Sequence, residues 1–232
     1  MVTIQEFTTK KPITMIGYEA GVCWGADVSD DEKNYKRGWE CLTNQHGRTY
    51  EFPDVYMTIE GYSARCIREW YTHIGCLPTR LQASTRYINY GNFEAVVPTT
   101  IVERNENAET VETEAYKTYV DALDNIRISI RKLIDLGVPK EDANMLLPLG
   151  MTTKIVDKRN LRNLIDMSHQ RECNRAYWEY RYLFSEIGLK LSHYSEEWET
   201  IVDKFFVPKC KYLGYCPEKY SCGMMPKQEE DN

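Results

Sequence analysis

The longest periodic pattern in the chain runs from Thr110 to Leu136 and predicts one long amphipathic helix. Gly137 and Pro139 end the pattern, where a C-terminal glycine and the first turn of another helix are expected. A stripe this broad needs a partner surface, so we expect it in the core or in a subunit interface. The stripe consists of Tyr116, Tyr119, Leu123, Ile126, Ile130, Leu133 and Ile134.

Shorter patterns on both sides of this helix predict a mixture of helices and strands. Val55, Met57 and Ile59 alternate with polar residues, the period of a half-buried strand. Residues 12–23 are also expected to form a strand that leads into a turn, and residues 151–156 to form a late strand. Further helices are expected over residues 62–71 and 139–147, and helix starts at Ser29, Asn160 and Ser195.

Length and composition bound the class of protein. A chain of 232 residues with 42% hydrophobic content can bury the core of one large α/β domain or two small ones. A net charge of −6 argues against a nucleic-acid polymer as partner. No apolar run is long enough to span a bilayer, and no N-terminal leader pattern is present. The eight cysteines are too scattered for a disulfide scaffold, so we expect a cytoplasmic protein with reduced thiols.

Residues 70–87 are the part of the chain that ordinary packing explains worst. They follow no clean helical or strand period, and they contain Gly75 and Pro78. Arginine, glutamine and serine side chains crowd together here, and these groups suit a phosphate and a heterocycle. The segment therefore predicts a binding loop, with a solvated polar surface loop as the alternative. The crowded side chains are His73, Arg80, Gln82, Ser84 and Arg86.

The same residues resemble a variant of the signature of the flavin-dependent thymidylate synthases. That family methylates dUMP with FAD rather than with a catalytic cysteine, and its signature opens Arg-His-Arg and closes Ser-x-Arg-Tyr. Here Ser84, Arg86 and Tyr87 match the closing Ser-x-Arg-Tyr of the signature. At the opening only His73 remains, because threonine and isoleucine occupy positions 72 and 74, where the family has arginines.

A second stretch carries the resemblance independently. Residues 160–179, from Asn160-Leu-Arg162 through Arg171 to Trp178-Glu179, are similar in order and without a gap to the family's C-terminal half. With residues 143–148 and the segment before the signature, the resemblance covers roughly residues 13 to 190. It implies an α/β (α+β) fold with a central, mostly antiparallel sheet flanked by long helices over residues 1–208. Residues 209–232 would form a cysteine-containing, partly disordered tail, with the disorder beginning at Met224.

The resemblance also implies a reaction and its residues. FAD would work with methylenetetrahydrofolate as one-carbon donor and NADPH as reductant, in a homotetramer with shared active sites. Arg171 takes the catalytic position, where a fixed cation stabilises charge on the uracil ring; the alternative is an exposed arginine paired with Glu172. The implied dUMP-binding residues are Glu69, Arg80, Gln82, Ser84, Thr85, Arg86 and Arg171, and the implied FAD-binding residues are Arg48, Thr49, Thr72, His73, Ile74, Gln82, Asn160, Arg162 and Asp166.

Departures from the family pattern leave two other functions open. Thr72, Ile74 and Asn144 stand where the family has arginines, and Arg80 is the candidate that replaces their charge. The altered loop would allow a flavin- and folate-dependent modification of another pyrimidine nucleotide. The other alternative is a non-catalytic nucleotide-binding or zinc-binding homologue.

Cysteines provide two minor alternatives. Cys76 lies inside the binding loop and is a possible nucleophile, although no histidine-assisted arrangement is visible in the sequence. Cys210, Cys216 and Cys222 could hold zinc with a fourth ligand, but their spacing is wider than that of common zinc knuckles.

Overall fold

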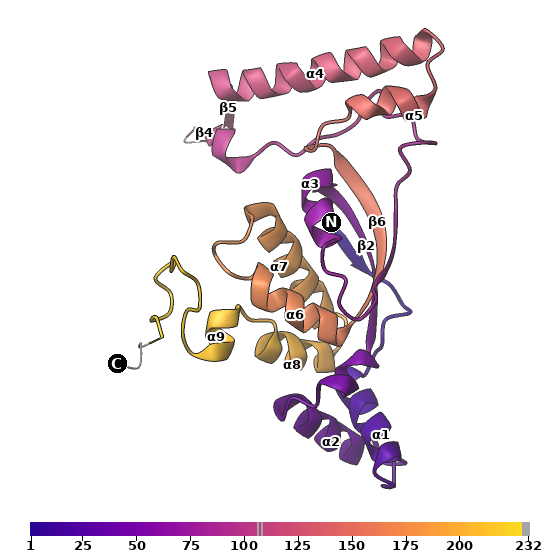
Figure 1. Cartoon of the computed structure of the whole chain (residues 1–232), viewed down its shortest axis with the longest axis vertical. Helices are drawn as coiled ribbons and strands as arrows, with labels where there is room; N and C mark the ends of the chain where they lie inside the picture. The colour runs from indigo at the N-terminus through magenta and orange to yellow at the C-terminus, as the bar shows by residue number, and fades with distance from the viewer. Residues whose placement is uncertain (106, 108, 229–232) are drawn as a thin grey trace. The chain divides into compact units, whose positions relative to one another are not determined.

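A computed structural model of the chain describes residues 1–105, 107 and 109–228 (Figure 1). Its main sheet has the strand order β1-β2-β6-β3, formed by β1 (Val2–Ile4), β2 (Asp54–Ser63), β6 (Thr152–Asn160) and β3 (Thr79–Gln82). β1 pairs antiparallel with β2, with Val2 opposite Ile59. The mixture of helices with an antiparallel sheet confirms the predicted fold class. The predicted strand at residues 55–59 lies within β2, and most of the one at 151–156 lies within β6.

The chain divides into two compact units. The first comprises residues 1–59, 71–80 and 156–232, and the second comprises residues 60–70 and 81–155. The boundary between a domain of residues 1–208 and a tail stays a prediction. The predicted disorder of the tail falls partly on residues 229–232, which lie outside the described residues.

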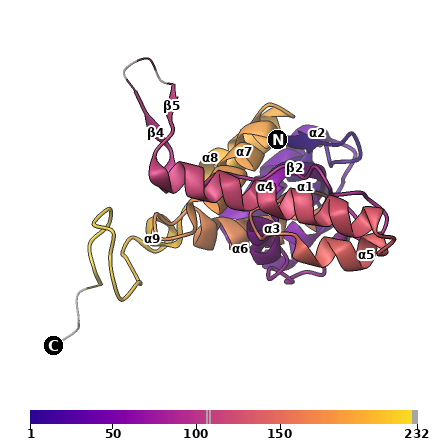
Figure 2. The same cartoon turned by 90° about the horizontal axis from the view of Figure 1, so that it is seen from above.

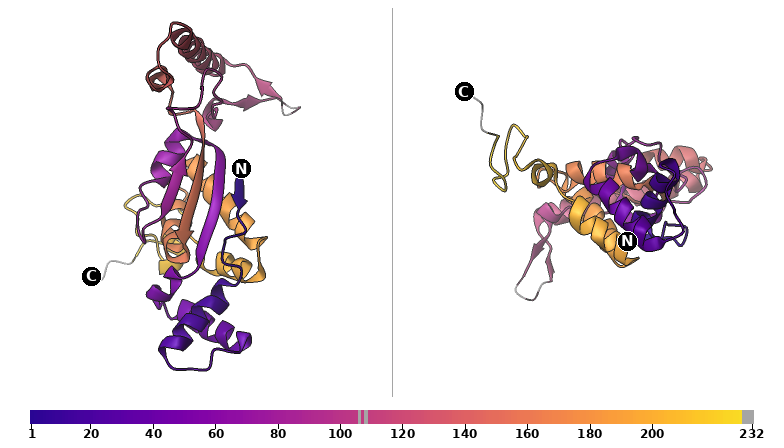
Figure 3. Two further views of the ribbon diagram at one scale, coloured as in Figure 1. Left: turned by 90° about the vertical axis from the view of Figure 1, so that its right-hand side faces the viewer. Right: turned by 90° about the horizontal axis from the view of Figure 1, so that it is seen from below.

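Two helices form a hairpin near the N-terminus of the first unit: α1 (Pro12–Cys23) and α2 (Asp31–Thr43), seen in Figures 1 and 3. The prediction of a strand over residues 12–23 was therefore wrong. Ile13, Ile16 and Ala20 are buried at helical spacing, and the glycines are packing positions rather than turn signals. A Cβ atom on Gly17 would lie 1.7 Å from the backbone oxygen of Asn34, so only glycine allows this helix contact.

The remaining helices of the first unit are α6 (Leu161–Arg171), α7 (Trp178–Ser192), α8 (Glu196–Phe205) and α9 (Lys209–Leu213), preceded by the 3-10 turn η1 (Gly47–Glu51). Local capping confirms two predicted helix starts. Asn160 accepts a hydrogen bond from the backbone of Asn163, and Ser195 accepts one from Trp198. The start expected at Ser29 falls slightly later, because Asp30 caps α2. Sequence patterns missed α7, whose Tyr180 and Phe184 are fully buried.

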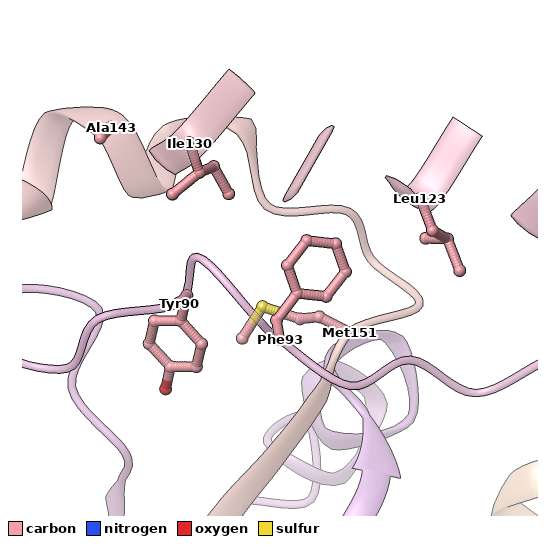
Figure 4. Packing of buried hydrophobic residues seen from close by; sticks show 6 residues of the cluster. All are labelled: Tyr90, Phe93, Leu123, Ile130, Ala143 and Met151. Atoms are coloured by element: carbon pink, nitrogen blue, oxygen red, sulfur yellow. The ribbon is translucent and has the colours of Figure 1, made fainter. Parts of the chain in front are cut away.

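The second unit contains the predicted long helix, which is α4 (Glu114–Asp135) and is capped by Thr113 (Figure 2). Leu123 and Ile130 of its stripe are buried in a cluster with Tyr90, Phe93, Ala143 and Met151 (Figure 4). This cluster places the stripe in the core of the unit, one of the two predicted locations. The other elements are α3 (Ala64–Trp70), η2 (Thr99–Ile101), the β4–β5 hairpin (Glu103–Arg104 and Thr110–Val111), α5 (Lys140–Ala143) and η3 (Asn144–Leu146). Over the described residues, no helix combines the length and apolarity needed to cross a bilayer.

Candidate functional site

A hydrogen bond joins two of the predicted site residues, His73 and Arg171. Arg171 is the last residue of α6 and is partly buried. Its Nε atom donates a hydrogen bond to Nε2 of His73 at 2.9 Å, and its guanidinium carbon lies 4.3 Å from the ring centre of Tyr180. Residues 98 positions apart in the chain therefore meet in one cluster. The partners seen here are those of an oriented side chain rather than of an arginine simply exposed to solvent.

Burial and two cations keep His73 neutral. Burial of the imidazole, followed by the charges of Arg171 and Arg159, lowers the pKa of His73 to about 4. A neutral imidazole that accepts a hydrogen bond through Nε2 carries its proton on Nδ1. His73 can thus orient the Arg171 guanidinium without competing with it for an anion.

Sequence reasoning missed the group that holds His73 in place. Arg159 and Asp157 are both 1% exposed and form a bidentate ion pair, with Nε–Oδ2 and Nη2–Oδ1 distances of 2.6 and 3.2 Å. Nη1 of Arg159 donates to the backbone oxygen of His73 at 3.0 Å and to Oδ1 of Asn163 at 2.7 Å. The signal available in the sequence was the alternation along β6. Asp157 and Arg159 fall on the same face as Ile155, where apolar side chains are expected.

Several of the residues predicted to bind FAD gather around the N-terminal half of α6. Asn160 caps the helix, and Arg162 forms an ion pair with Glu51 of η1 at 2.6 Å. Arg162 and Asp166 line a pocket of about 580 Å³, together with Gly47, Tyr50, His169 and Tyr212. The rings of His169 and Tyr212 contact each other with their centres 4.6 Å apart and their planes tilted by 31°. The pocket therefore combines cations with aromatic surfaces.

The other predicted FAD residues are spread more widely. The Arg48 side chain is 88% exposed and reaches Glu51 at 3.7 Å, and the Thr49 hydroxyl bonds to the backbone of His46 at 2.8 Å. Thr72 and Ile74 are exposed on either side of His73. Gln82 belongs to the other unit, where its amide donates to the hydroxyl of Thr153 at 3.2 Å.

The loop after His73 is strained and apolar. Cys76 and Leu77 have φ angles of 57° and 51°, which side chains other than glycine rarely adopt. Leu77 is 89% exposed. Burial, followed by the charge of Glu51, raises the pKa of the Cys76 thiol. A protonated thiol is a poor nucleophile, so this environment argues against the cysteine alternative.

The predicted phosphate-binding residues lie together in the second unit. Ser84 Oγ accepts the backbone N–H of Arg86 at 3.1 Å, and the Arg86 guanidinium forms an exposed ion pair with Glu141 at 2.8 Å. Asn144, buried to 4% exposure, donates its amide to the backbone oxygens of Thr85 and Ile88 at 2.7 and 3.1 Å. The amide at position 144 thus fixes the loop that carries Ser84 and Arg86.

The remaining dUMP-binding predictions are distributed between the units. Glu69 lies partly buried on α3 of the second unit, whereas Arg80 and Arg171 belong to the first. Arg80 donates from Nη2 to the backbone oxygen of Tyr71 at 3.2 Å, and its guanidinium carbon lies 4.3 Å from the centre of the Tyr71 ring. Its other terminal nitrogen is buried and has no hydrogen-bond partner among the described residues.

The C-terminal cysteines line a second pocket of about 480 Å³ with Arg171. Cys173 joins Cys210, Cys216 and Cys222 in its wall. Within residues 1–105, 107 and 109–228, however, no three histidine, cysteine or acidic side chains are grouped so that they could hold a metal ion. Four cysteines thus line one pocket, as the zinc hypothesis requires, but among the described residues they are not arranged as zinc ligands.

Known proteins were compared with the chain. Residues 7–193 match the model of the family described as thymidylate synthase complementing protein. The flavin-dependent thymidylate synthase of Clostridium tetani is 31% identical over 233 residues, covering 93% of this chain and 90% of that protein. The enzyme of the same name from Nitratidesulfovibrio vulgaris is 26% identical over 228 residues, covering 91% of this chain and 87% of that protein.

Solved structures show the same fold. A flavin-dependent thymidylate synthase from Helicobacter pylori, complexed with FAD and dUMP, is similar with a TM-score of 0.64 and 20% identity, covering 86% of this chain and 98% of that one. A UMP/dUMP methylase from Streptomyces cacaoi, bound with 5-Br dUMP, is similar with a TM-score of 0.68 and 13% identity, covering 89% and 96%. The family match spans most of the chain and includes His73, Arg86, Arg162 and Arg171. This chain therefore belongs to the flavin-dependent thymidylate synthase family of enzymes.

Proposed function

We propose that this chain is an FAD-dependent thymidylate synthase that converts dUMP to dTMP. Methylenetetrahydrofolate would donate the one-carbon unit and NADPH the electrons, and no cysteine nucleophile would take part. Family membership supports the reaction class, and the orientation of Arg171 supports the presence of a working site. We place the enzyme in the cytoplasm, as its scattered free cysteines suggest.

The observation that carries the proposal is the anchored guanidinium of Arg171. Uracil becomes a carbon nucleophile only when negative charge builds on its N3 and O4 side, and a fixed cation in a site shielded from water lowers that cost. His73 and Tyr180 hold the guanidinium from two sides. Because His73 is neutral, it orients Arg171 without adding a second charge.

Arg86 and Ser84 would bind the phosphate of the nucleotide. The Arg86–Glu141 ion pair is exposed to solvent, and water screens such pairs so that they contribute little to stability. A phosphate dianion can therefore displace Glu141 at small cost and gain a bidentate contact with the guanidinium. Asn144 keeps the loop in place during this exchange.

The pocket at α6 has the groups that FAD requires. Tyr50 and the His169–Tyr212 pair offer aromatic surfaces, and Arg162, Lys204 and Lys211 offer cations for a pyrophosphate. FAD, when bound, would carry the hydride, and the protein would only position it. We propose that Arg162, Asp166 and His73 contact the cofactor, with Asn160 holding the start of α6.

Arg80 would compensate for the arginines missing at positions 72, 74 and 144. One of its terminal nitrogens is buried and unpaired among the described residues, so a ligand anion would satisfy it. Losing one such charge-assisted hydrogen bond should cost about 1.5 to 3 kcal/mol in nucleotide binding. An unchanged dUMP affinity of the Arg80→Ala variant would rule out this role.

Shared sites in a homotetramer would follow the family pattern. Each unit exposes large apolar side chains near its predicted ligand residues: Ile74 and Leu77 in the first, and Leu81 and Tyr87 in the second. Exposed apolar groups of this size are typical of protein–protein contact surfaces. Analytical ultracentrifugation should show a tetramer, whereas a monomer at micromolar concentration would argue against shared sites.

The test of the function needs two measurements. Purified protein should be yellow with flavin absorbance, and it should oxidise NADPH in a manner that depends on dUMP and forms dTMP with methylenetetrahydrofolate. The Arg171→Lys variant keeps the charge but loses the Nε–H group that bonds to His73, so its kcat should fall about 100-fold. Arg175→Lys is the matched control, because Arg175 bonds instead to the tail at Tyr220. Colourless protein with stoichiometric zinc would support the non-catalytic alternative.

A second pyrimidine substrate has one observation in its favour. The opening of the signature is altered at Thr72 and Ile74, and the loop behind it has strained backbone at Cys76 and Leu77. Both features lie within residues 70–87, which the sequence predicts to be a binding loop. Parallel assays with dUMP, UMP and dCMP would decide between the substrates, since only the true one should drive flavin reoxidation and acquire the new carbon.

A further inference from the structure

The buried Asp157–Arg159 pair has no part in the reaction proposed above. Both side chains are fully buried, and the residues lie two positions apart on β6, so they share one face of the strand. The fork contact uses Nε and Nη2 of the arginine, at 2.6 and 3.2 Å from the carboxylate oxygens. The carboxylate thus neutralises the guanidinium without engaging Nη1.

Stability alone does not explain such a pair. Taking two charges out of water is expensive, and apolar side chains of similar volume usually serve as well. What distinguishes this pair is the third nitrogen, Nη1. It reaches outside the pair to the His73 backbone oxygen at 3.0 Å and to Oδ1 of Asn163 on α6 at 2.7 Å. One side chain therefore connects β6, α6 and the segment that carries His73.

The contact falls at the altered opening of the signature. Thr72 and Ile74 lack the arginines of the family pattern, but arginines from two other elements hold the backbone on either side of Thr72. Arg80 donates to the carbonyl of residue 71 at 3.2 Å, and Arg159 donates to the carbonyl of residue 73 at 3.0 Å. The ring of His73 then accepts from Arg171 at 2.9 Å.

We propose that the Asp157–Arg159 pair is a positioning device that fixes His73 so that its imidazole accepts the hydrogen bond from Arg171. Arg159 touches neither the nucleotide nor the flavin in this proposal. It acts through His73, and its effect on ligand binding rests on the proposed function. Its effect on the His73 ring does not, because every contact invoked joins two residues of this chain.

The test removes the pair without leaving a buried charge. In the double variant Asp157→Leu/Arg159→Met, apolar side chains of similar size replace both partners, so the protein should still fold, with a modest drop in unfolding temperature because Asn163 Oδ1 and the His73 carbonyl lose their donor. Nitrogen-15 NMR of histidine-labelled, ligand-free protein reports which ring nitrogen carries the proton. His73→Gln assigns the His73 signal among the four histidines. The wild type should show a single Nδ1–H form, and the double variant a mixture of tautomers.

Nucleotide binding gives the second measurement. Loss of the anchored His73 should weaken dUMP binding about 10- to 100-fold, as expected for a misplaced binding group. Arg159→Lys covers the case in which the double variant does not fold. A lysine still neutralises Asp157, but it cannot make the fork and reach the His73 carbonyl at once, so it should also lose the single tautomer.

The outcomes separate two failures. A single Nδ1–H tautomer and unchanged dUMP affinity in the folded double variant, or a single tautomer in Arg159→Lys, would overturn the positioning role. A wild type that shows the ordered tautomer but binds no dUMP would instead refute the proposed function and leave the positioning role standing.

Discussion

Lowering the pH should change the free energies of unfolding of His73→Gln and Glu172→Gln in opposite directions, each measured relative to the double variant that lacks both groups. The two wild-type groups are shifted oppositely in the folded protein. Burial, with the charges of Arg171 and Arg159, lowers the pKa of His73 from 6.5 to about 4. Burial raises the pKa of Glu172 from 4.5 to about 7, and Lys211 only partly offsets this effect. His73 is not among the causes of the pKa shift of Glu172, and Glu172 is not among those of His73. Their contributions to stability can therefore be measured separately.

The signs follow from which state binds more protons. Between pH 6.5 and 4.5 an unfolded histidine takes up a proton that folded His73 does not, so this group destabilises the fold as the pH falls. Over the same range folded Glu172 binds a proton that the unfolded chain does not, so this group stabilises the fold as the pH falls. At 1.36 kcal/mol per pH unit, and with both side chains partly exposed, each contribution is about 2 kcal/mol.

The assay is urea unfolding at pH 6.5 and 4.5. It compares the wild type, the two single variants and the double variant His73→Gln/Glu172→Gln. Glu172→Gln retains His73, so acidification should lower its free energy of unfolding by about 2 kcal/mol relative to that of the double variant. His73→Gln retains Glu172, so acidification should raise its free energy of unfolding by about 2 kcal/mol relative to that of the double variant. Other carboxylates contribute equally to all four proteins and cancel. If both single variants follow the double variant in parallel, the burial argument for these groups is refuted.

Three further predictions concern packing and the loops. Gly17→Ala should destabilise the fold by about 3 kcal/mol or more, because its Cβ would lie 1.7 Å from the Asn34 oxygen; Gly188→Ala, with ordinary contacts of 3.5 Å, should be neutral or stabilising in the same thermal unfolding assay. Asn144→Ala removes two hydrogen bonds to the Ser84–Arg86 loop and should cost about 1–3 kcal/mol in urea unfolding and weaken dUMP binding; wild-type values for both would contradict its role. Cys76→Ser should retain dUMP-dependent turnover, since burial keeps that thiol protonated; complete loss of turnover would revive the nucleophile hypothesis.

Features that depend on near neighbours were predictable from the sequence. Asn160 and Ser195 cap helices by bonding to a backbone three residues away, and the long stripe of α4 repeats within one element. The signature close at Ser84–Arg86 is local too, since Ser84 bonds to the backbone two residues on. Such interactions need only the right residue at a short, fixed spacing, so a pattern in the sequence reports them.

The error at residues 12–23 shows where local patterns fail. Glycine is permissive in a turn and equally required where two helix backbones approach closely, and the sequence carries the same letter for both. Only the position of α2 reveals that Gly17 serves the second purpose.

The sequence by itself determined the family, the helix starts at Asn160 and Ser195 and the long helix α4, and it predicted Arg171 and His73 as site residues. Tertiary structure alone decided that these two side chains meet and that Arg159 holds one of them. The partners of His73 lie 86 and 98 residues away along the chain, and no periodic pattern spans such a separation. Burial then sets the charge states, because the pKa of His73 depends on the desolvation and the cations that the folded chain brings around it.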